Sequence, residues 1–358
     1  MAPRPSQHQL SSEDRMHHLP AAKPPASALL GPVMHVVDMV HGVRSRLAQV
    51  KGFTPTILAY PGYGSTSWVR VLGRVMLIGK PAKTLGKVRG WRAFTSVPIR
   101  YSEIEVEING VSHTVQADSG GIIDVVLEAS LTPGWHSVLL RSQTAAPTEA
   151  RILVVASDVS FGVISDIDDT VMVTALPRPL LALWNTLVLS ERARTPTPGM
   201  AVLLERIVAR HPEAPVLYLS TGAWNVAPAL ERFLGRNLYP AGVLLLTDWG
   251  PSRQHWFRSG REHKLKNLAR LAQEFPSIKW LLVGDDGQHD PQIYAEFARI
   301  HATQTAAVAI RELSAGEALL AGGRSHEDAL ATEHGAVPWV SAPDGAGLAE
   351  KLKEHGLL

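Results

Sequence analysis

The sequence contains no cysteine among its 358 residues. This absence excludes disulfides, thiolate metal sites and cysteine nucleophiles, so any metal ion must bind to oxygen or imidazole ligands. Aromatic residues make up only 6% of the chain, and charges of the two signs nearly balance, which leaves a formal net charge of +2. So small a net charge favours no extended nucleic-acid-binding surface, and we expect no nucleic acid among the partners.

Long apolar runs are also missing. The longest apolar runs, around Leu245 and Leu282, are far shorter than the roughly 18 residues that cross a bilayer. The first residues show no signal-peptide pattern. We therefore expect a cytoplasmic protein. Peripheral contact at a membrane surface stays open, because it needs only a small apolar or basic patch. The 45% of hydrophobic residues predict a globular chain, its length favours two domains, and the sequence leaves the oligomeric state unknown.

Three segments differ in their patterns. Residues 1–50 begin with an aperiodic stretch rich in Pro, Ser and His and continue with helical spacing over Val33–Leu47, which predicts a flexible arm and a helix. Residues 51–157 contain short β-type runs separated by turn residues, and Asn109-Gly110 predicts a type I′ hairpin. We expect a small, all-β, sandwich-like domain there.

Residues 158–358 alternate apolar strands with helical runs near 201–211, 226–234, 264–275 and 291–299. This alternation predicts an α/β domain with a doubly wound parallel sheet covered on both faces. Because ligands of such sheets bind beyond the carboxyl ends of the strands, the polar residues at those ends are the candidates for chemistry.

The first candidates follow the apolar run FGVIS, where Asp166, Asp168 and Asp169 lie within four positions. Carboxylates this close repel each other, and a hard divalent cation such as Mg²⁺ would neutralise them. One of Asp166 and Asp168 could act as nucleophile or metal ligand while the other transfers protons, and attack of an Asp on phosphorus gives an aspartyl-phosphate. An exposed turn or a helix-capping cluster is the structural alternative.

Three further elements share this kind of position. Ser220 and Thr221 end the run VLYLST, Lys264 is expected to open a helix, and Asp285 and Asp286 end the run WLLVG. Hydroxyls and backbone N–H groups at a strand end can hold phosphoryl oxygens, a lysine can balance their charge, and either Asp can complete a metal shell. A helix cap and a solvated lysine explain these residues one by one, but together they predict one site.

The order of these motifs resembles the haloacid dehalogenase (HAD) superfamily of phosphotransferases. Within it, residues 158–312 are similar to the catalytic domain of the actin-patch type of phosphatidate phosphatase and its bacterial relatives, with SDIDDT, STGAWN, DWG, HK and GDDGQHDPQIY as the matching pieces. The chain differs in carrying Thr221, Gly222 and Ala223 before Trp224, and Asp286 where the family often has Ser. The resemblance implies a HAD-like doubly wound sheet preceded by the β-sandwich-like domain.

The resemblance also implies roles for individual residues. Asp166 would be the nucleophile and Asp168 the general acid and base, with the backbone carbonyl of Asp168 among the ligands of Mg²⁺. The implied catalytic residues are Asp166, Asp168, Thr170, Ser220 and Lys264; the substrate-binding residues are Ser220, Thr221, Asn225 and Lys264; the metal ligands are Asp166, Asp168 and Asp285.

The predicted function is that of a Mg²⁺-dependent phosphatase that forms an aspartyl-phosphate, with phosphatidate as the favoured substrate and diacylglycerol as the product. The segment from Leu180 to Arg194 combines apolar and basic residues, which suits acyl chains and an anionic head group but equally a buried helix with a basic end. A phosphatase for small soluble phosphomonoesters and a non-catalytic scaffold with a vestigial acidic site are the alternatives.

Overall fold

The computed structural model describes residues 47–48, 50, 52–79, 96–173, 195–247, 256–287, 289–321 and 337–358. The predicted N-terminal arm, nearly all of the expected helix over 33–47 and the apolar and basic segment over 180–194 lie outside these ranges. Among the helices that are described, none is long and apolar enough to span a membrane.

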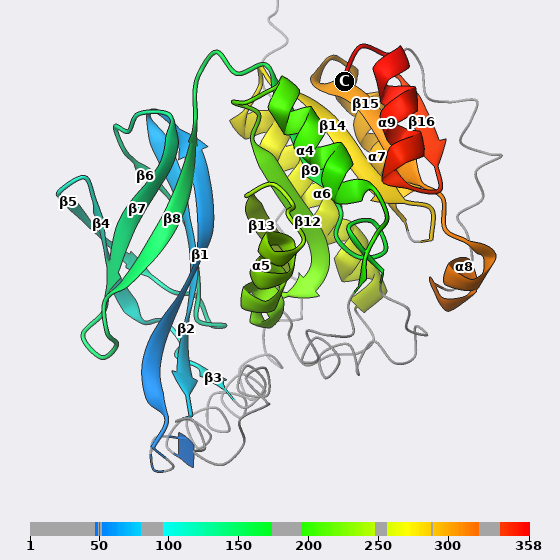
Figure 1. Cartoon of the computed structure of the whole chain (residues 1–358). Coiled ribbons are helices and arrows are strands. Elements are labelled where there is room, and N and C mark those ends of the chain that lie inside the picture. The colour runs from blue at the N-terminus through cyan, green and yellow to red at the C-terminus, as the bar shows by residue number, and fades with distance from the viewer. Residues whose placement is uncertain are drawn as a thin grey trace, which may run out of the picture. The chain divides into compact units, whose positions relative to one another are not determined.

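Eight strands from the first half of the chain form one mixed sheet (Figure 1). They are β1 (Thr54–Ser65), β2 (Trp68–Ile78), β3 (Val97–Pro98), β4 (Glu103–Ile108), β5 (Val111–Gln116), β6 (Ile122–Glu128), β7 (Gly134–Arg141) and β8 (Thr148–Val155). The order is β3-β2-β1-β8-β7-β4-β5, with β6 paired to β2. β1 runs parallel to β8, whereas the hairpin neighbours are antiparallel. Alternating side chains such as Ile104 and Val106 of β4 are buried in the core of this sheet.

The hairpin predicted at Asn109-Gly110 is confirmed. Ile108 of β4 pairs with Val111 of β5 across a two-residue turn, and Asn109 and Gly110 have φ of 50° and 80°. Positive φ at both central residues is the type I′ geometry, which Asn and Gly adopt most readily.

The second half of the chain contributes a six-stranded sheet in the order β13-β12-β9-β14-β15-β16, and all of its neighbours pair in parallel. The strands are β9 (Phe161–Ser165), β12 (Val216–Ala223), β13 (Val243–Thr247), β14 (Lys279–Asp285), β15 (Thr305–Arg311) and β16 (Trp339–Ala342). A small two-stranded sheet pairs β10 (Met172–Val173) with β11 (Thr195–Pro196).

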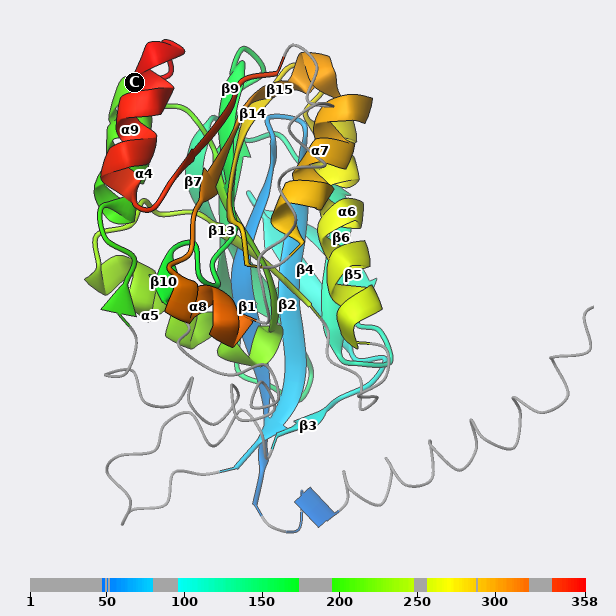
Figure 2. The same ribbon diagram turned by 90° about the vertical axis from the view of Figure 1, so that its right-hand side faces the viewer.

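The helices described are α4 (Met200–Arg210), α5 (Ala227–Arg236), α6 (Trp256–Glu274), α7 (Asp290–Ile300), α8 (Ala315–Ala321) and α9 (Gly345–Glu354), with short 3₁₀ turns η2 (Trp224–Val226) and η3 (Ala302–Gln304). Figure 2 shows α4 and α9 together on one side of the parallel strands and α6 and α7 together on the other. The helices expected within residues 158–358 are confirmed, except that α6 begins at Trp256 rather than at Lys264.

The fold class predicted from the sequence is wrong for the chain. Strands account for 42% of the structure and helices for 29%, and the strands form a curled mixed sheet and a half-barrel rather than a HAD-like doubly wound parallel α/β fold. The physical reason lies in the first half. Instead of a small sandwich-like domain, its strands join into one eight-stranded sheet, in which β1 and β2 are 12 and 11 residues long. The parallel pairing of β1 with β8 joins residues far apart in the sequence, and local patterns do not encode it.

Side chains of the first sheet pack into the core of the parallel strands, so that Leu47–Leu358 form one unit. Tyr63 of β1 donates a hydrogen bond to Glu274 Oε2 of α6 over 2.6 Å, and Arg70 of β2 donates to Glu274 Oε1 over 2.7 Å. The first sheet is thereby fixed to the helix that carries Lys264.

Candidate active site

Asp166 follows β9 directly. The strand is almost entirely buried, and its hydrogen bonding to β14 continues through Asp166 N, which donates to Val283 O over 2.8 Å. The chain then turns sharply, because Val171 N and Met172 N both donate to Ile167 O. Asp169 lies in this turn with a φ of 58°, a left-handed conformation that Asp tolerates better than most residues. The turn keeps Asp168 and Thr170 at the same end of the sheet as Asp166.

Asp285 ends the neighbouring strand β14, whose residue Val283 lies in register with Ser165. The Asp285 carboxylate is fully buried. It accepts hydrogen bonds from Gly287 N over 2.8 Å and from Thr170 Oγ1 over 3.4 Å. Thr170 therefore connects the turn after β9 to the acid at the end of β14.

Asp290 opens α7 and brings a third buried carboxylate to the same place. One oxygen from each of Asp166, Asp285 and Asp290 lies within 4.8 Å of the other two. The close approach of α7 depends on Gly284, since a Cβ at this position would lie 2.6 Å from Asp290 Oδ2. We call these three residues the carboxylate cluster.

Lys264 reaches the carboxylate cluster from α6 and is 3% exposed. Its Nζ donates to Asp166 Oδ1 over 2.6 Å and to Asp290 Oδ1. Burial lowers the pKa of Lys264, but the attraction of the two carboxylates outweighs it, so that this pKa lies above its usual range. Lys264 is therefore charged at neutral pH.

The carboxylate cluster has the electrostatics of a cation site. Burial raises the pKa of Asp166 well above its usual range, although Lys264 acts against it, and burial together with the charge of Asp290 does the same for Asp285. Three carboxylates facing one ammonium carry a formal charge of −2, which one divalent cation would neutralise. Asp166 Oδ2 and Asp290 Oδ2 are buried and accept no hydrogen bond from any residue in the described ranges. Buried oxygens of this kind suit a hard cation such as Mg²⁺.

Ser220 lies on β12, the strand on the other side of β9, and is fully buried. Its Oγ donates to Asp168 Oδ2 over 2.8 Å and accepts from Gly222 N over 2.9 Å. α6 approaches this strand closely, since a Cβ at Gly260 would lie 3.1 Å from the Cγ2 atom of Thr221. The absence of a side chain at Gly260 thus lets α6 pack against β12.

The structure brings most of the predicted residues together. Asp166, Asp285 and Lys264 meet around the cluster, Thr170 contacts Asp285, and Ser220 contacts Asp168. Thr221 lies in β12, two residues before its end and close to α6, and Asn225 lies in the 3₁₀ turn η2 that follows, where it accepts a hydrogen bond from Arg74 of the first sheet.

Sequence reasoning did not single out Asp290 as a cluster member. The available signal was its position at a helix start, six residues after the strand-end Gly284 whose missing side chain makes room for it. Asp286, offered as an alternative ligand, accepts a hydrogen bond from Leu313 N over 2.8 Å and lies outside the cluster of three.

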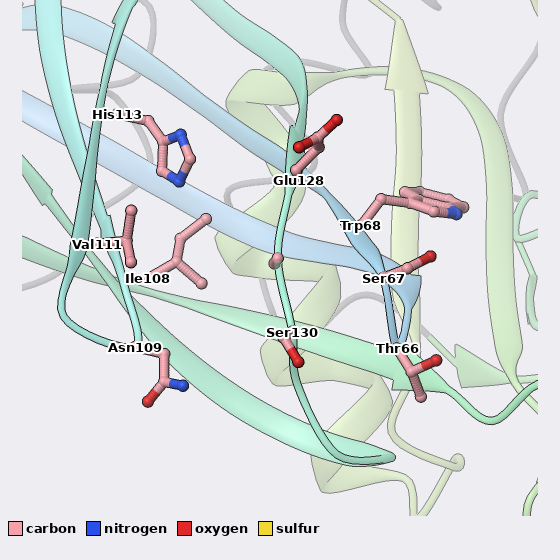
Figure 3. Close-up of a pocket in the computed structure, with 10 residues that line it drawn as sticks. Thr66, Ser67, Trp68, Ile108, Asn109, Val111, His113, Glu128 and Ser130 are labelled. Atoms are coloured by element: carbon pink, nitrogen blue, oxygen red, sulfur yellow. The ribbon is translucent and has the colours of Figure 1, made fainter.

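A pocket of about 820 Å³ lies on the first sheet (Figure 3). Its lining comes from the β1–β2 turn, the β4–β5 hairpin and the end of β6: Thr66, Ser67, Trp68, Ile108, Asn109, Val111, His113, Glu128, Ala129 and Ser130. None of these residues belongs to β9, β12, β14 or α6, so this pocket is separate from the carboxylate cluster.

Residues 161–312, which contain every residue of the site, match the family model of the catalytic domain of phosphatidate phosphatase APP1. Phosphatidate phosphatase APP1 of Saccharomyces cerevisiae is 26% identical over 157 residues, which cover 43% of this chain and 26% of the yeast protein. An uncharacterized protein of Schizosaccharomyces pombe is 26% identical over 152 residues, which cover 42% of this chain and 25% of that protein. The match thus spans about a quarter of the length of these relatives.

Among solved structures, a carbohydrate acetylesterase from Xanthomonas citri is similar with a TM-score of 0.27 and 10% identity, over 72% of this chain and 68% of that one. This likeness is too slight to indicate a shared fold. The sequence comparisons thus show that the site-bearing segment is similar to the catalytic domain of a phosphatidate phosphatase.

Proposed function

We propose that this protein is a Mg²⁺-dependent phosphatase that converts phosphatidate to diacylglycerol through a phosphoryl group carried on Asp166. The carrying observation is the carboxylate cluster with Lys264 in contact, within the segment that matches a phosphatidate phosphatase catalytic domain. Phosphoryl transfer depends mainly on positioning and on neutralising the charge of the transferred group, and the cluster with Lys264 is suited to both.

In the first step, a carboxylate oxygen of Asp166 forms a bond to phosphorus while the bond from phosphorus to the leaving alkoxide breaks. Asp168 gives its proton to that alkoxide, and the alcohol leaves. In the second step, Asp168 takes a proton from water, the water oxygen bonds to phosphorus, and the bond to Asp166 breaks. Inorganic phosphate is released and both side chains return to their starting states.

Different neighbouring residues contact Asp166 and Asp168, which suits the two acids to different roles. Lys264 donates to Oδ1 of Asp166 and so orients the attacking carboxylate. Ser220 donates to Asp168 and so orients its carboxyl group. A Mg²⁺ held by Asp166, Asp285 and Asp290 would supply positive charge to the phosphoryl oxygens.

The substrate assignment is tested by phosphate release from phosphatidate in mixed micelles with Mg²⁺, beside a panel of soluble phosphomonoesters. EDTA and Asp166→Asn should both abolish release. Asp158→Asn is a matched control, because it makes the same chemical change at an exposed residue upstream of β9, and it should retain wild-type activity.

Each outcome discriminates. Metal-dependent release from phosphatidate that disappears in Asp166→Asn supports the whole proposal. Release from soluble esters alone rejects the lipid substrate and keeps the phosphatase reaction. No release from any ester by the intact, metal-loaded protein rejects the reaction and favours a scaffold.

A further inference from the structure

We infer that Arg311, the last residue of β15, is a positioning residue for the proton transfer carried out by Asp168. This inference rests on the proposed function, in which Asp168 protonates the leaving alkoxide. Arg311 donates through Nη1 to the backbone carbonyl of Asp169 over 2.6 Å. It therefore binds the main chain at the residue that directly follows the proton donor Asp168.

Asp169, the residue that Arg311 contacts, has an unusual backbone conformation. Asp169 adopts a left-handed backbone with a φ of 58°, which is costly for a residue with a Cβ. On the inner side of the same turn, Asp169 N donates to Met172 O over 2.8 Å. Because Asp169 is hydrogen-bonded through both its N–H and its carbonyl, the backbone from Asp168 to Thr170 keeps one orientation. This backbone in turn sets the direction of the Asp168 side chain.

Arg311 is itself rigidly held. Its side chain is 5% exposed, and Nη2 donates to Glu317 Oε1 of α8 over 2.7 Å. Nε donates to Pro343 O over 3.3 Å, ahead of α9. Glu317 is fixed in turn, because Ser314 N donates to its Oε2 over 2.9 Å. Three acceptors in three directions require the planar fork of a guanidinium, and a lysine cannot satisfy them together.

The alternative is that Arg311 only holds β15, α8 and the chain before α9 together. The two roles differ in their dependence on the leaving group. An alkoxide must be protonated as it departs, whereas p-nitrophenolate leaves without a proton. Misplacing Asp168 therefore slows hydrolysis of an alkyl phosphate such as phosphatidate more than hydrolysis of p-nitrophenyl phosphate. A general loss of structure slows both equally.

The test compares kcat/KM of wild type and Arg311→Lys on phosphatidate and on p-nitrophenyl phosphate, with Mg²⁺ present. This ratio reports the steps up to departure of the alcohol, so the second step of the reaction does not enter. We expect phosphatidate hydrolysis to fall about 10-fold while p-nitrophenyl phosphate hydrolysis stays within about 2-fold of wild type. Asp168→Asn sets the scale, with the same preference and a larger loss of about 10²-fold or more.

Glu317→Gln is the second variant, because it leaves the contact with Asp169 in place and loosens only the anchor of Arg311. Its kcat/KM should also fall more on phosphatidate than on p-nitrophenyl phosphate, but by a smaller factor than in Arg311→Lys. This variant keeps the test available if Arg311→Lys does not fold. Arg141→Gln, on an exposed ion pair of the first sheet, should match wild type on both substrates.

Equal losses on the two substrates, or no loss in Arg311→Lys, would overturn the positioning role. Wild-type protein that hydrolyses neither ester contradicts the proposed function instead, so the two failures are distinguishable.

Discussion

The phenol ring of Tyr60, on β1, stacks on the indole of Trp224, with ring centroids 4.4 Å apart and planes inclined by 20°. Trp224 directly follows β12, the strand that carries Ser220, and precedes Asn225. Arg74 of β2 donates to Asn225 Oδ1 over 3.3 Å. The first sheet thus contacts the turn beyond β12, the strand whose Ser220 orients Asp168 in the proposed reaction.

The Tyr60–Trp224 stack predicts an energetic coupling between the first sheet and the site. In a double-mutant cycle of Tyr60→Leu and Trp224→Leu, we expect a coupling of about 1 kcal/mol in the free energy of unfolding, because stacked aromatic pairs contribute that much beyond burial. Urea denaturation of the four proteins measures it. Strictly additive losses would show that the stack couples nothing.

Removal of Lys264 should harm both stability and activity. Lys264→Met leaves Asp166 and Asp290 buried without their cation, and breaking a buried ion pair from one side costs about 3–5 kcal/mol. Activity should fall at least about 10²-fold, since a preorganised charge on the phosphoryl group is lost. Denaturation and phosphate release test the two effects separately. A Lys264→Met protein as active as wild type would remove Lys264 from the mechanism.

Metal binding should stabilise the protein through the carboxylate cluster. Mg²⁺ at about 100 times its Kd would add about 2.7 kcal/mol to the free energy of unfolding. The gain should be largely lost in Asp290→Asn and retained in Asp158→Asn, as measured by thermal unfolding with Mg²⁺ and with EDTA. A gain that survives in Asp290→Asn would exclude Asp290 as a ligand.

His263 predicts an acid-side loss of stability. Its burial lowers its pKa to about 4, with help from the charges of Arg270, Lys264 and Lys266 and against a backbone hydrogen bond to Leu245. The unfolded chain binds a proton at His263 below about pH 6.5, whereas the folded protein does so only near pH 4.

Because the unfolded state holds more protons in this interval, stability falls as the pH drops from 6.5 towards 4, by at most about 3 kcal/mol from this residue. Urea midpoints of wild type and His263→Gln across that interval measure the contribution, and the variant should show the shallower decline. Parallel curves would show that His263 does not titrate differently on folding.

The sequence predicted local elements of this protein better than their assembly. Apolar runs that end in polar residues identified β9, β12 and β14, and the side chains at their ends, Asp166, Ser220 and Asp285, lie around one site. Parallel strand ends converge at one edge of a sheet, so position alone carried this information.

What the sequence could not predict depends on contacts between distant segments. Asp290 joins the cluster because Gly284 lets α7 pack against β14, and Arg311 reaches Asp169 across 142 residues of sequence. The curled first sheet depends on the pairing of β1 with β8. Such pairings are selected by the packing of whole elements, which no local pattern specifies.

The most direct test of the account is to trap the phosphoryl group on the protein. Wild-type protein is mixed with phosphatidate labelled with ³²P in the head group, quenched in acid, digested and sequenced by mass spectrometry. We expect an acid-stable, alkali-labile label on Asp166 in wild type and in Asp158→Asn, and none in Asp166→Asn. Turnover without any label on Asp166, or a label that persists in Asp166→Asn, would contradict it.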